Sequence, residues 1–367
     1  MTQTRLLLVT DAVGGVWVYS LELARALRPH GVEALLAVMG PSPTAKQREE
    51  AGDLRLIDTG LPLEWLDTSP EEIGRAGRAM AELAEREGAD VVQTSSAALL
   101  ADAHFSQPCV AAQHSCVASW WRAVRGTPLP AEFEWRRQLV QRGLARASAI
   151  VAPSLAFAAE TSRIYDVPVA AVHNGRERMR SRDIPQGEFV FTAGRLWDEG
   201  KNIATVDRAA ARLEVPFQAA GPTSGPNGTH VDLKHAQALG PLSASRLAGL
   251  YAARPIYASA ALYEPFGLSV LEAAHAGCAL VLSDIPTHRE IWGGAAIFVP
   301  GRDDMAFAAA ISDLLNDPQE REQLGLLARA RAHHYTPERM ARGMVDIYSR
   351  LLVDRAKSHP AQMAGAA

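Results

Sequence analysis

Short, uninterrupted apolar runs alternate with helical patterns along this chain, and this rhythm limits its possible folds more than any other feature. The run "RLLLVT" at residues 5–10 is followed by a helical pattern that Gly31 ends, and then by a second run, "VEALLAV", at 32–38. A strand that is apolar at every position has to be buried on both faces. The alternation therefore predicts parallel strands covered by helices on both sides, an α/β fold.

The rhythm breaks once and then restarts. Further apolar runs occur, and the last of them, "VAAVHNG" at 169–175, is expected to form a strand. The polar stretch "NGRERMRSRDIPQGE" spans residues 174–188, and strand and helix patterns alternate again from residue 189. Charged residues mixed with Gly and Pro are typical of a linker. We expect two doubly wound, Rossmann-like domains joined near residues 174–186. From about residue 303 the pattern is wholly helical, with a Thr–Pro–Glu helix start at 336–338.

Charge and cysteine content restrict the class of protein. The net charge is −4, which disfavours non-specific attraction to nucleic acid, so no nucleic-acid partner is expected. The three cysteines, Cys109, Cys116 and Cys278, are odd in number and far apart, which favours a reducing compartment over a disulfide scaffold. No segment reaches the roughly 18 apolar residues of a membrane span. A cytoplasmic α/β enzyme is the simplest interpretation.

Ligands of open parallel sheets bind beyond the carboxyl ends of the strands, so the loops after strands are the places to search. In "TDAVGGVW", Gly14 and Gly15 lie between the first strand and its helix, where backbone can approach an anion. An ordinary tight turn explains the same glycines, and the spacing is not that of a dinucleotide fingerprint. His114 follows another strand and should face the ligand, although a lone histidine is more often a packed or surface residue.

Two cations flank a loop of the second domain. Arg195 follows a strand and Gly194, and Lys201 starts the next helix. A pair of surface charges explains them equally well. If they bind a pyrophosphate instead, each charge-assisted hydrogen bond contributes roughly 1.5–3 kcal/mol.

The stretch "YEPFGLSVLEAAHAG" places Glu264 before a helix and Glu272 inside it. Helix capping accounts for Glu264, but it does not account for Glu272, which interrupts an apolar run. Eight positions of separation are too many for the two carboxylates to act as one acid–base pair. The N–H groups around Gly267 would lie between them and favour a phosphate. The spacing therefore suggests two ends of one elongated ligand.

With these features in place, the sequence resembles the retaining glycosyltransferases of the GT-B fold, in the glycogen-synthase-like family four (glycosyl transferases group 1). The most specific match is "EPFGLSVLE", and "AGRLWDEGKN", "DAVGG" and "HNG" match further family segments in the family's order. The resemblance covers nearly the whole chain. It implies an N-terminal acceptor-side domain over 1–175, with a helix at about 336–357 crossing back to it. The C-terminal domain, 176–335, would bind the nucleotide-sugar.

The resemblance also implies roles for the candidate residues of the C-terminal domain. Glu272 would bind the ribose hydroxyls of the donor, and Arg195 and Lys201 its diphosphate. Glu264 would hold the sugar hydroxyls and phosphate together with the backbone N–H groups of Phe266, Gly267 and Leu268.

From the N-terminal domain, Gly15 and its neighbour Gly14 would approach the phosphate and His114 would lie near the transferred sugar. The candidate catalytic set is His114, Arg195, Lys201 and Glu264. The sequence departs from the family after "HNG", where an apolar residue and an acid are usual and Arg176 and Glu177 follow here. It also lacks the Pro-Ser that commonly precedes the Glu-Pro-Phe-Gly.

The expected reaction is transfer with retention of configuration by a front-face route, in which the leaving phosphate helps to deprotonate the acceptor. No convincing metal motif is present, because "RDDM" at 302–305 is interpreted as a helix cap. Two cations and a helix N-terminus can stabilise the leaving diphosphate instead, so neither metal nor cofactor is expected.

Donor and acceptor identities are less constrained. UDP-, GDP- and ADP-sugars all remain possible donors. Trp120, Trp121 and Arg122 lie in a stretch rich in aromatic and basic residues, which suits an acceptor sugar or weak membrane-surface contact, although a plain amphipathic helix explains it too. The alternatives to a transferase are a GT-B nucleotide-sugar epimerase and a non-catalytic nucleotide-sugar-binding protein. A phosphorylase is disfavoured, because the chain is too short and shows no lysine that would anchor pyridoxal phosphate.

Overall fold

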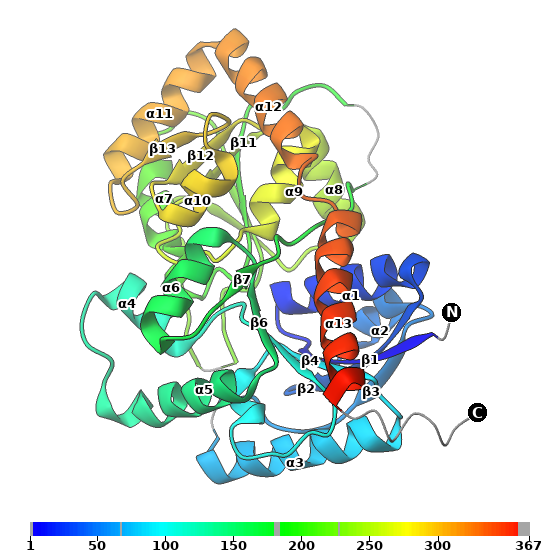
Figure 1. Ribbon diagram of the computed structural model, residues 1–367. Coiled ribbons are helices and arrows are strands. Elements are labelled where there is room, and N and C mark those ends of the chain that lie inside the picture. The colour runs from blue at the N-terminus through cyan, green and yellow to red at the C-terminus, as the bar shows by residue number, and fades with distance from the viewer. Residues whose placement is uncertain (1–2, 67, 180–183, 227, 359–367) are drawn as a thin grey trace. The chain divides into compact units, whose positions relative to one another are not determined.

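Two separate parallel sheets organise the chain in the computed structural model (Figure 1), which describes residues 3–66, 68–179, 184–226 and 228–358. The first unit contains the described chain up to Trp121, then Thr127–Gly175 and the segment from Pro337 onward. The second contains Arg122–Gly126 and Arg176–Thr336. Arg122–Gly126 thus belongs to the second unit, whereas the expected N-terminal domain covered all of 1–175. Residues 180–183 of the expected linker lie outside the described residues.

The sheet of the first unit has seven strands, and every pairing in it is parallel. In spatial order they are β3 (Arg55–Asp58), β2 (Val32–Met39), β1 (Thr4–Asp11), β4 (Val91–Thr94), β5 (Cys109–Ala112), β6 (Ala149–Ala152) and β7 (Ala170–Ala171). On β1, Leu7 and Val9 pack into one core while Leu6 and Leu8 pack into another. Burial of both faces confirms the predicted parallel α/β arrangement and explains why the strand is apolar throughout.

Helices flank this sheet. They are α1 (Gly15–Leu27), η1 (Arg28–His30), α2 (Ala45–Ala51), α3 (Pro70–Arg86), η2 (Ala97–Leu100), α4 (Val117–Arg125), η3 (Ala131–Phe133), α5 (Glu134–Arg146), α6 (Leu155–Tyr165) and α13 (Pro337–Ser358). The predicted first helix ends as a short 3₁₀ turn, and Gly31 stops it with φ 73°. The strand expected over 169–175 is confined to β7, because the following residues form no ladder.

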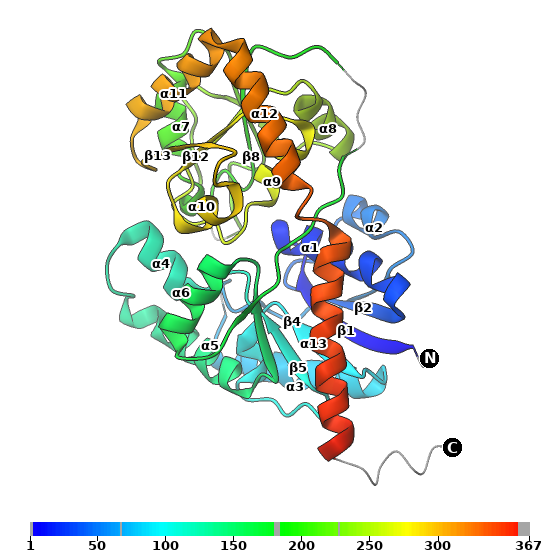
Figure 2. The same cartoon turned by 45° about the horizontal axis from the view of Figure 1, so that its top comes forward.

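The last helix belongs to the first unit although it follows the whole of the second in sequence. Met340, Met344 and Tyr348 of α13 lie in the same core as Leu23 and Leu27 of α1. Figure 2 shows α13 running beside α1. The predicted helix start is confirmed, because α13 begins at Pro337 with an acidic residue in its first turn.

The sheet of the second unit has six parallel strands. In spatial order they are β10 (Gln237–Gly240), β9 (Phe217–Ala220), β8 (Val190–Ala193), β11 (Ile256–Ser259), β12 (Leu280–Ser283) and β13 (Ile297–Val299). Its helices are η4 (Glu199–Lys201), α7 (Ile203–Ala210), α8 (Ala244–Ala252), α9 (Leu268–Ala276), α10 (Pro286–Trp292), α11 (Asp304–Asn316) and α12 (Pro318–Ala332). The structure confirms the helical pattern predicted after residue 303. Asp303 caps α11 by accepting a hydrogen bond from Ala306 N at 2.9 Å, which confirms the helix-cap interpretation of "RDDM".

Two glycines bring β8 and β9 close together at their carboxyl ends. A Cβ atom added to Gly221, whose φ is 134°, would lie 1.8 Å from the carbonyl oxygen of Gly194. Gly194 N donates to Ala220 O at 3.0 Å in the same place. A side chain at 221 would therefore push away the loop that carries Arg195.

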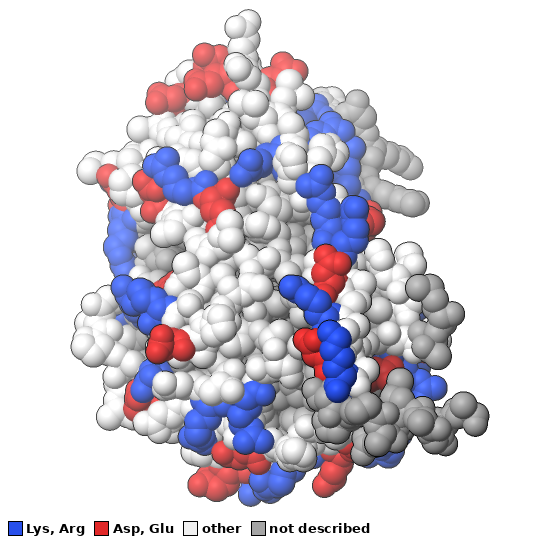
Figure 3. Space-filling view, in the orientation of Figure 1, with Lys and Arg blue, Asp and Glu red and all other residues white. Residues whose placement is uncertain are grey.

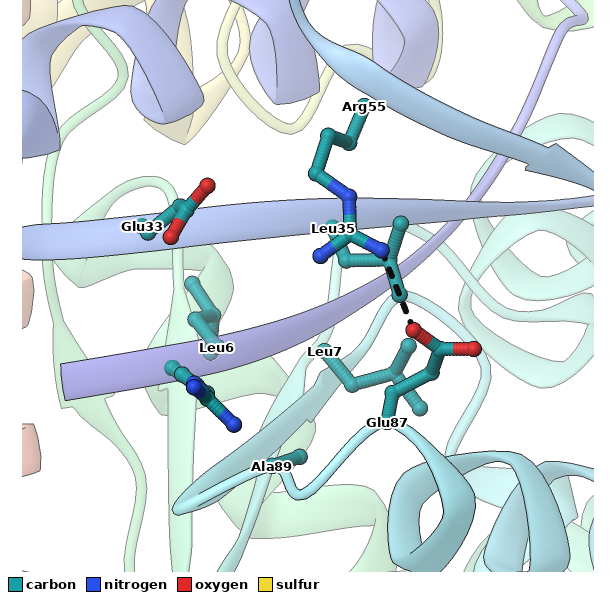
Figure 4. Close-up of a pocket in the computed structure, with 8 residues that line it drawn as sticks. Leu6, Leu7, Glu33, Leu35, Arg55, Glu87 and Ala89 are labelled. Carbon is teal, nitrogen blue, oxygen red and sulfur yellow. Dashed lines mark hydrogen bonds and ion pairs between the residues drawn. The ribbon is translucent and has the colours of Figure 1, made fainter.

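A cavity of about 20 Å³ lies at the opposite, amino-terminal edge of the first sheet (Figure 4). Leu6, Leu7 and Leu35 line it, and Arg55 forms an ion pair with Glu87 beside it, with Nη2 and Oε2 3.1 Å apart. This space holds about one water molecule. It is too small for a nucleotide-sugar and lies away from the loops that follow the strands.

Charged side chains of both signs are interspersed on the face that Figure 3 shows. This face therefore presents no large field of a single sign.

Candidate active site

The candidate residues of the second unit come from neighbouring strand ends. Arg195 follows β8, and Glu264 lies in the segment between β11 and α9. Because β8 and β11 are adjacent and parallel, their following loops meet at one edge of the sheet. The sequence folds this way because the strands are apolar and the polar residues begin directly after them.

Lys201 and Glu264 form the centre of this group. Lys201 Nζ donates a hydrogen bond to Glu264 Oε2, and their side chains are 19% and 11% exposed. Burial acts to raise the pKa of Glu264, but the charge and hydrogen bond of Lys201, with smaller effects of His288 and Arg195, hold it below its ordinary value. The carboxylate is therefore ionised at neutral pH, as an acceptor for hydroxyl groups has to be.

Arg195 is held by a neighbour that the sequence did not single out. Its Nη2 donates to Asp198 Oδ2 at 2.9 Å, and its guanidinium lies 5.6 Å from the centre of the Trp197 ring. Asp198 also accepts a hydrogen bond from Gly200 N at 2.9 Å. The aspartate thus orients the arginine and the turn that presents Lys201.

The start of α9 lies beside the same carboxylate. Gly267 is the N-cap residue with φ 93°, and no side chain caps the helix. A Cβ on Gly267 would lie 3.4 Å from Glu264 Cγ, and one on Gly194 would lie 3.7 Å from Lys201 Cε. The capping interpretation of Glu264 is therefore wrong for α9, because its carboxylate pairs with Lys201. The helix N-terminus and two cations converge on one place, which suits an anion.

Phe266 and Leu268 flank the N-cap. The Phe266 ring is buried and packs edge-on against Tyr335, with ring centres 5.6 Å apart. Its side chain therefore anchors the loop in the core. Any contact of Phe266 or Leu268 with a phosphate would involve backbone N–H groups, as expected.

Glu272 has a different cationic partner. Arg176 Nε donates to Glu272 Oε1 at 3.0 Å, and Tyr251 OH lies 3.5 Å from Oε2. The two glutamates therefore pair with two separate cations, and their roles at different parts of one ligand stay a prediction.

Behind Glu264 lies a buried histidine that the sequence analysis missed. His288 Nδ1 is 2.9 Å from the carbonyl oxygen of Ser283 and therefore carries the proton. Burial lowers the pKa of His288, so it is neutral at neutral pH. Thr287 Oγ1 donates to the carbonyl oxygen of Glu264 at 2.6 Å. Thr287 thus holds the loop of Glu264 through its backbone, and His288 bonds to the end of β12. Nothing in the sequence pattern marks either residue.

In the first unit, Gly14 and Gly15 are exposed at the start of α1. Gly14 is the N-cap with φ 85°, and no side chain caps this helix either. The structure thus builds the conformation that an anion site requires, as it also would for a tight turn.

His114 follows β5 and packs against Tyr19, with ring centres 4.3 Å apart. Burial lowers its pKa to about 4, and its Nε2 is buried with no hydrogen-bond partner in the described part of the chain. Tyr19 is held in turn by Gln93 Nε2 at 3.0 Å, and Tyr348 of α13 donates to Gln93 Oε1. No sequence pattern predicted this network, which links His114 to the last helix.

The suggested acceptor residues lie on α4, shortly after His114. Trp121 Nε1 donates to Thr127 Oγ1 at 3.1 Å, and its ring centre is 5.5 Å from that of Phe133. Trp120 packs beside Trp121 with ring centres 6.2 Å apart. Arg122 follows them on the same helix and groups with the second unit.

The described residues contain neither a cluster of metal ligands nor a membrane-spanning helix. Among them, no three His, Cys, Asp or Glu side chains gather closely enough to hold a metal ion. None of their helices has the length and apolar character needed to cross a membrane.

Two family models match this sequence. Glycosyltransferase Family 4 matches residues 13–178, and Glycosyl transferases group 1 matches residues 230–331. The first region contains Gly14, Gly15 and His114, and the second contains Glu264 and Glu272. Arg195 and Lys201 fall between the two matched regions.

Curated relatives carry a consistent name. A D-inositol 3-phosphate glycosyltransferase of Xylanimonas cellulosilytica is 25% identical over 390 residues, which cover 93% of this chain and 92% of that protein. A protein of the same name from Corynebacterium urealyticum is 30% identical over 129 residues, covering 34% of this chain and 30% of that protein.

Solved structures share the fold at lower identity. The sucrose-phosphate synthase of Thermosynechococcus elongatus superposes with a TM-score of 0.78 and 19% identity, over 96% of this chain and 100% of that one. HepE of Anabaena, solved in complex with UDP-glucose, gives a TM-score of 0.74 and 16% identity over 94% of this chain and 99% of that one. With the two parallel sheets, these likenesses confirm the predicted two-domain, Rossmann-like fold.

Proposed function

We propose a reaction for this chain, which is a family 4-like glycosyltransferase of the GT-B fold. It transfers a sugar from a nucleotide-diphosphate sugar to an acceptor hydroxyl, with retention of anomeric configuration and without a metal ion. The observation that carries the proposal is the convergence of Arg195, Lys201 and Glu264 on the N-terminus of α9. This arrangement supplies positive charge for a diphosphate beside a carboxylate for sugar hydroxyls.

Cleavage of a glycosyl–phosphate bond places negative charge on the departing diphosphate. Lys201 and Arg195, with the N–H groups at the start of α9, stabilise this charge as it develops, because they are held in place before the reaction. Loss of about 3 kcal/mol of such stabilisation slows the step on the order of 100-fold. This fixed positive charge supports transfer without a metal.

Glu264 has its carboxylate engaged by Lys201, and we assign it to sugar binding rather than to nucleophilic attack. Retention then follows the front-face route, in which the departing phosphate takes the proton of the acceptor hydroxyl as the new bond forms on the same face. His114, neutral because burial lowers its pKa to about 4, suits hydrogen bonding to the sugar rather than cationic stabilisation.

The donor proposal starts from UDP-sugars, because solved complexes of the Anabaena neighbour contain UDP and UDP-glucose. GDP- and ADP-sugars remain in the test. For the acceptor, the names of the two D-inositol 3-phosphate glycosyltransferase relatives make a phosphorylated polyol the first compound to try. Trp120, Trp121 and Arg122 are the proposed acceptor contacts, since aromatic faces suit sugars and a guanidinium suits phosphate.

A cytoplasmic location is part of the proposal. In the described part of the chain, no disulfide joins Cys109, Cys116 or Cys278, as expected of a reducing compartment. The segment that contains Trp120, Trp121 and Arg122 is also proposed to contact a membrane surface weakly. Flotation with anionic liposomes tests this contact, and absence of co-flotation would exclude it.

The test is a panel of UDP-, GDP- and ADP-sugars incubated with and without inositol 3-phosphate, with release of nucleoside diphosphate as the readout. The proposal expects release that rises with acceptor for one donor. Donor epimerised without any acceptor would instead support a nucleotide-sugar epimerase of GT-B fold. Binding without turnover would support a nucleotide-sugar-binding protein.

A further inference from the structure

Arg176 is anchored at both its backbone and its side chain within the second unit. Its backbone N donates to Tyr335 O at 3.3 Å, and its Nε donates to Glu272 Oε1 at 3.0 Å. The side chains of Arg176 and Glu272 are 20% and 10% exposed. The ion pair is therefore largely shielded from water, where charge-assisted hydrogen bonds are stronger than at an open surface.

The contact between Arg176 and Glu272 restricts the orientation of the Glu272 carboxylate. Glu272 projects from α9, whose backbone is fixed by its own hydrogen bonds, so the remaining freedom lies in the side-chain torsions. A guanidinium donor on Oε1, with Tyr251 OH 3.5 Å from Oε2, restrains the plane of the carboxylate. A vicinal diol is bound best by a carboxylate whose two oxygens are held in one orientation before the ligand arrives.

We propose that Arg176 is a positioning residue of the donor site: it holds the ionised carboxylate of Glu272 in the orientation that accepts the ribose hydroxyls of a nucleoside diphosphate. The inference rests on the proposed function, which assigns a nucleotide-sugar to this site. It adds Arg176 to the proposed donor site and gives that site a specificity. A carboxylate fixed by Arg176 discriminates a ribose from a sugar that lacks the 2′- and 3′-hydroxyls.

The test measures binding of two probes by titration calorimetry to the full-length protein: the nucleoside diphosphate that the donor panel selects, and its 2′,3′-dideoxy analogue. For Arg176→Ala we expect roughly 10-fold weaker binding of the ribose form and less than 2-fold change for the dideoxy form. With the full donor, KM should rise while kcat changes little, as for an interaction made equally in ground and transition states.

Arg178→Ala is the matched control, since Arg178 is exposed and lies two residues along the same segment. It should bind both probes as the wild type does. Arg176→Lys keeps the charge without the planar fork, so it should recover part of the ribose preference and remain informative if Arg176→Ala folds poorly.

The outcomes separate the two proposals. A wild-type protein that binds no nucleoside diphosphate contradicts the proposed function. Wild-type binding combined with equal losses of both probes in Arg176→Ala, or with no loss, overturns the role of Arg176. An Arg176 effect that persists in a Glu272→Gln background also overturns it, because a residue acting through Glu272 has no effect once that carboxylate is gone.

Discussion

Lys201 donates a hydrogen bond to the carboxylate of Glu264 although the two residues are 63 positions apart in sequence. The pair joins the turn after β8 to the loop after β11. It keeps a largely buried carboxylate ionised and places a cation beside the N-terminus of α9. The chemistry proposed for this protein depends on that arrangement.

Replacement of Lys201 should therefore reduce turnover strongly. We expect Lys201→Ala to lower kcat on the order of 100-fold, because about 3 kcal/mol of stabilisation of the departing diphosphate is lost. Initial rates at saturating donor measure this. Lys234→Ala, at an exposed lysine of the same unit, is the control and should keep full activity. A Lys201→Ala variant with normal kcat would show that the diphosphate role is wrong.

Stability should decrease in mild acid partly through His114. Its ordinary pKa of 6.5 falls to about 4 in the folded protein because of burial. Below pH 6.5 the unfolded chain takes up a proton that the folded chain does not, so the folding free energy weakens as pH falls towards 4. The slope is at most about 1.4 kcal/mol per pH unit.

Urea unfolding at several pH values between 7 and about 4.5 measures this dependence. His114→Asn should flatten it, whereas His30→Asn, at an exposed histidine, should leave it unchanged. An identical pH dependence in His114→Asn and wild type would rule out the buried, neutral imidazole.

Loss of a hydrogen bond from the network behind His114 should lower the free energy of unfolding. Tyr348 donates to Gln93 Oε1, and both side chains are fully buried. Tyr348→Phe leaves that oxygen without its donor and should cost about 1–3 kcal/mol of unfolding free energy. Tyr335→Phe, which removes a longer bond of 3.4 Å to Ile291 O, should cost less. Equal losses in the two variants would count against the network.

Gly221 should tolerate no side chain. Gly221→Ala would place a Cβ 1.8 Å from Gly194 O in a backbone conformation with φ 134°, so we expect about 3 kcal/mol of destabilisation and weaker activity through displacement of Arg195. Gly249→Ala is the control, because an added Cβ there meets no atom within 4 Å inside helix α8. It should be neutral or slightly stabilising. Thermal unfolding of both variants decides the matter.

The sequence predicted the parts of the fold that depend on local pattern. β1 is apolar at every buried position from Leu6 to Val9, and such a run has few alternatives to a parallel strand covered on both faces. β10 and β13 gave no such signal: β10 has two exposed residues, and β13 is three residues long. Short edge strands gain their structure from pairing with neighbours, which periodicity does not reveal.

The candidate site was predicted as far as residue type and position after a strand allow. Arg195, Lys201 and Glu264 all lie at one edge of the second sheet. The ion pairs among these residues could not be predicted from the sequence. The Arg176–Glu272 contact spans 96 positions, and the role of Asp198 depends on the turn that it shapes. No partner of Arg176 was predicted, whereas the structure pairs its side chain with Glu272.

The central proposal is transfer with retention and without a metal, and one measurement tests it directly. Product is formed from the selected donor and acceptor in excess chelator, and its anomeric configuration is determined from the proton NMR coupling of the new glycosidic bond. We predict a product with the anomeric configuration of the donor, formed at the same rate with and without chelator. An inverted product, or one that forms only after a divalent metal is added, would contradict the proposal.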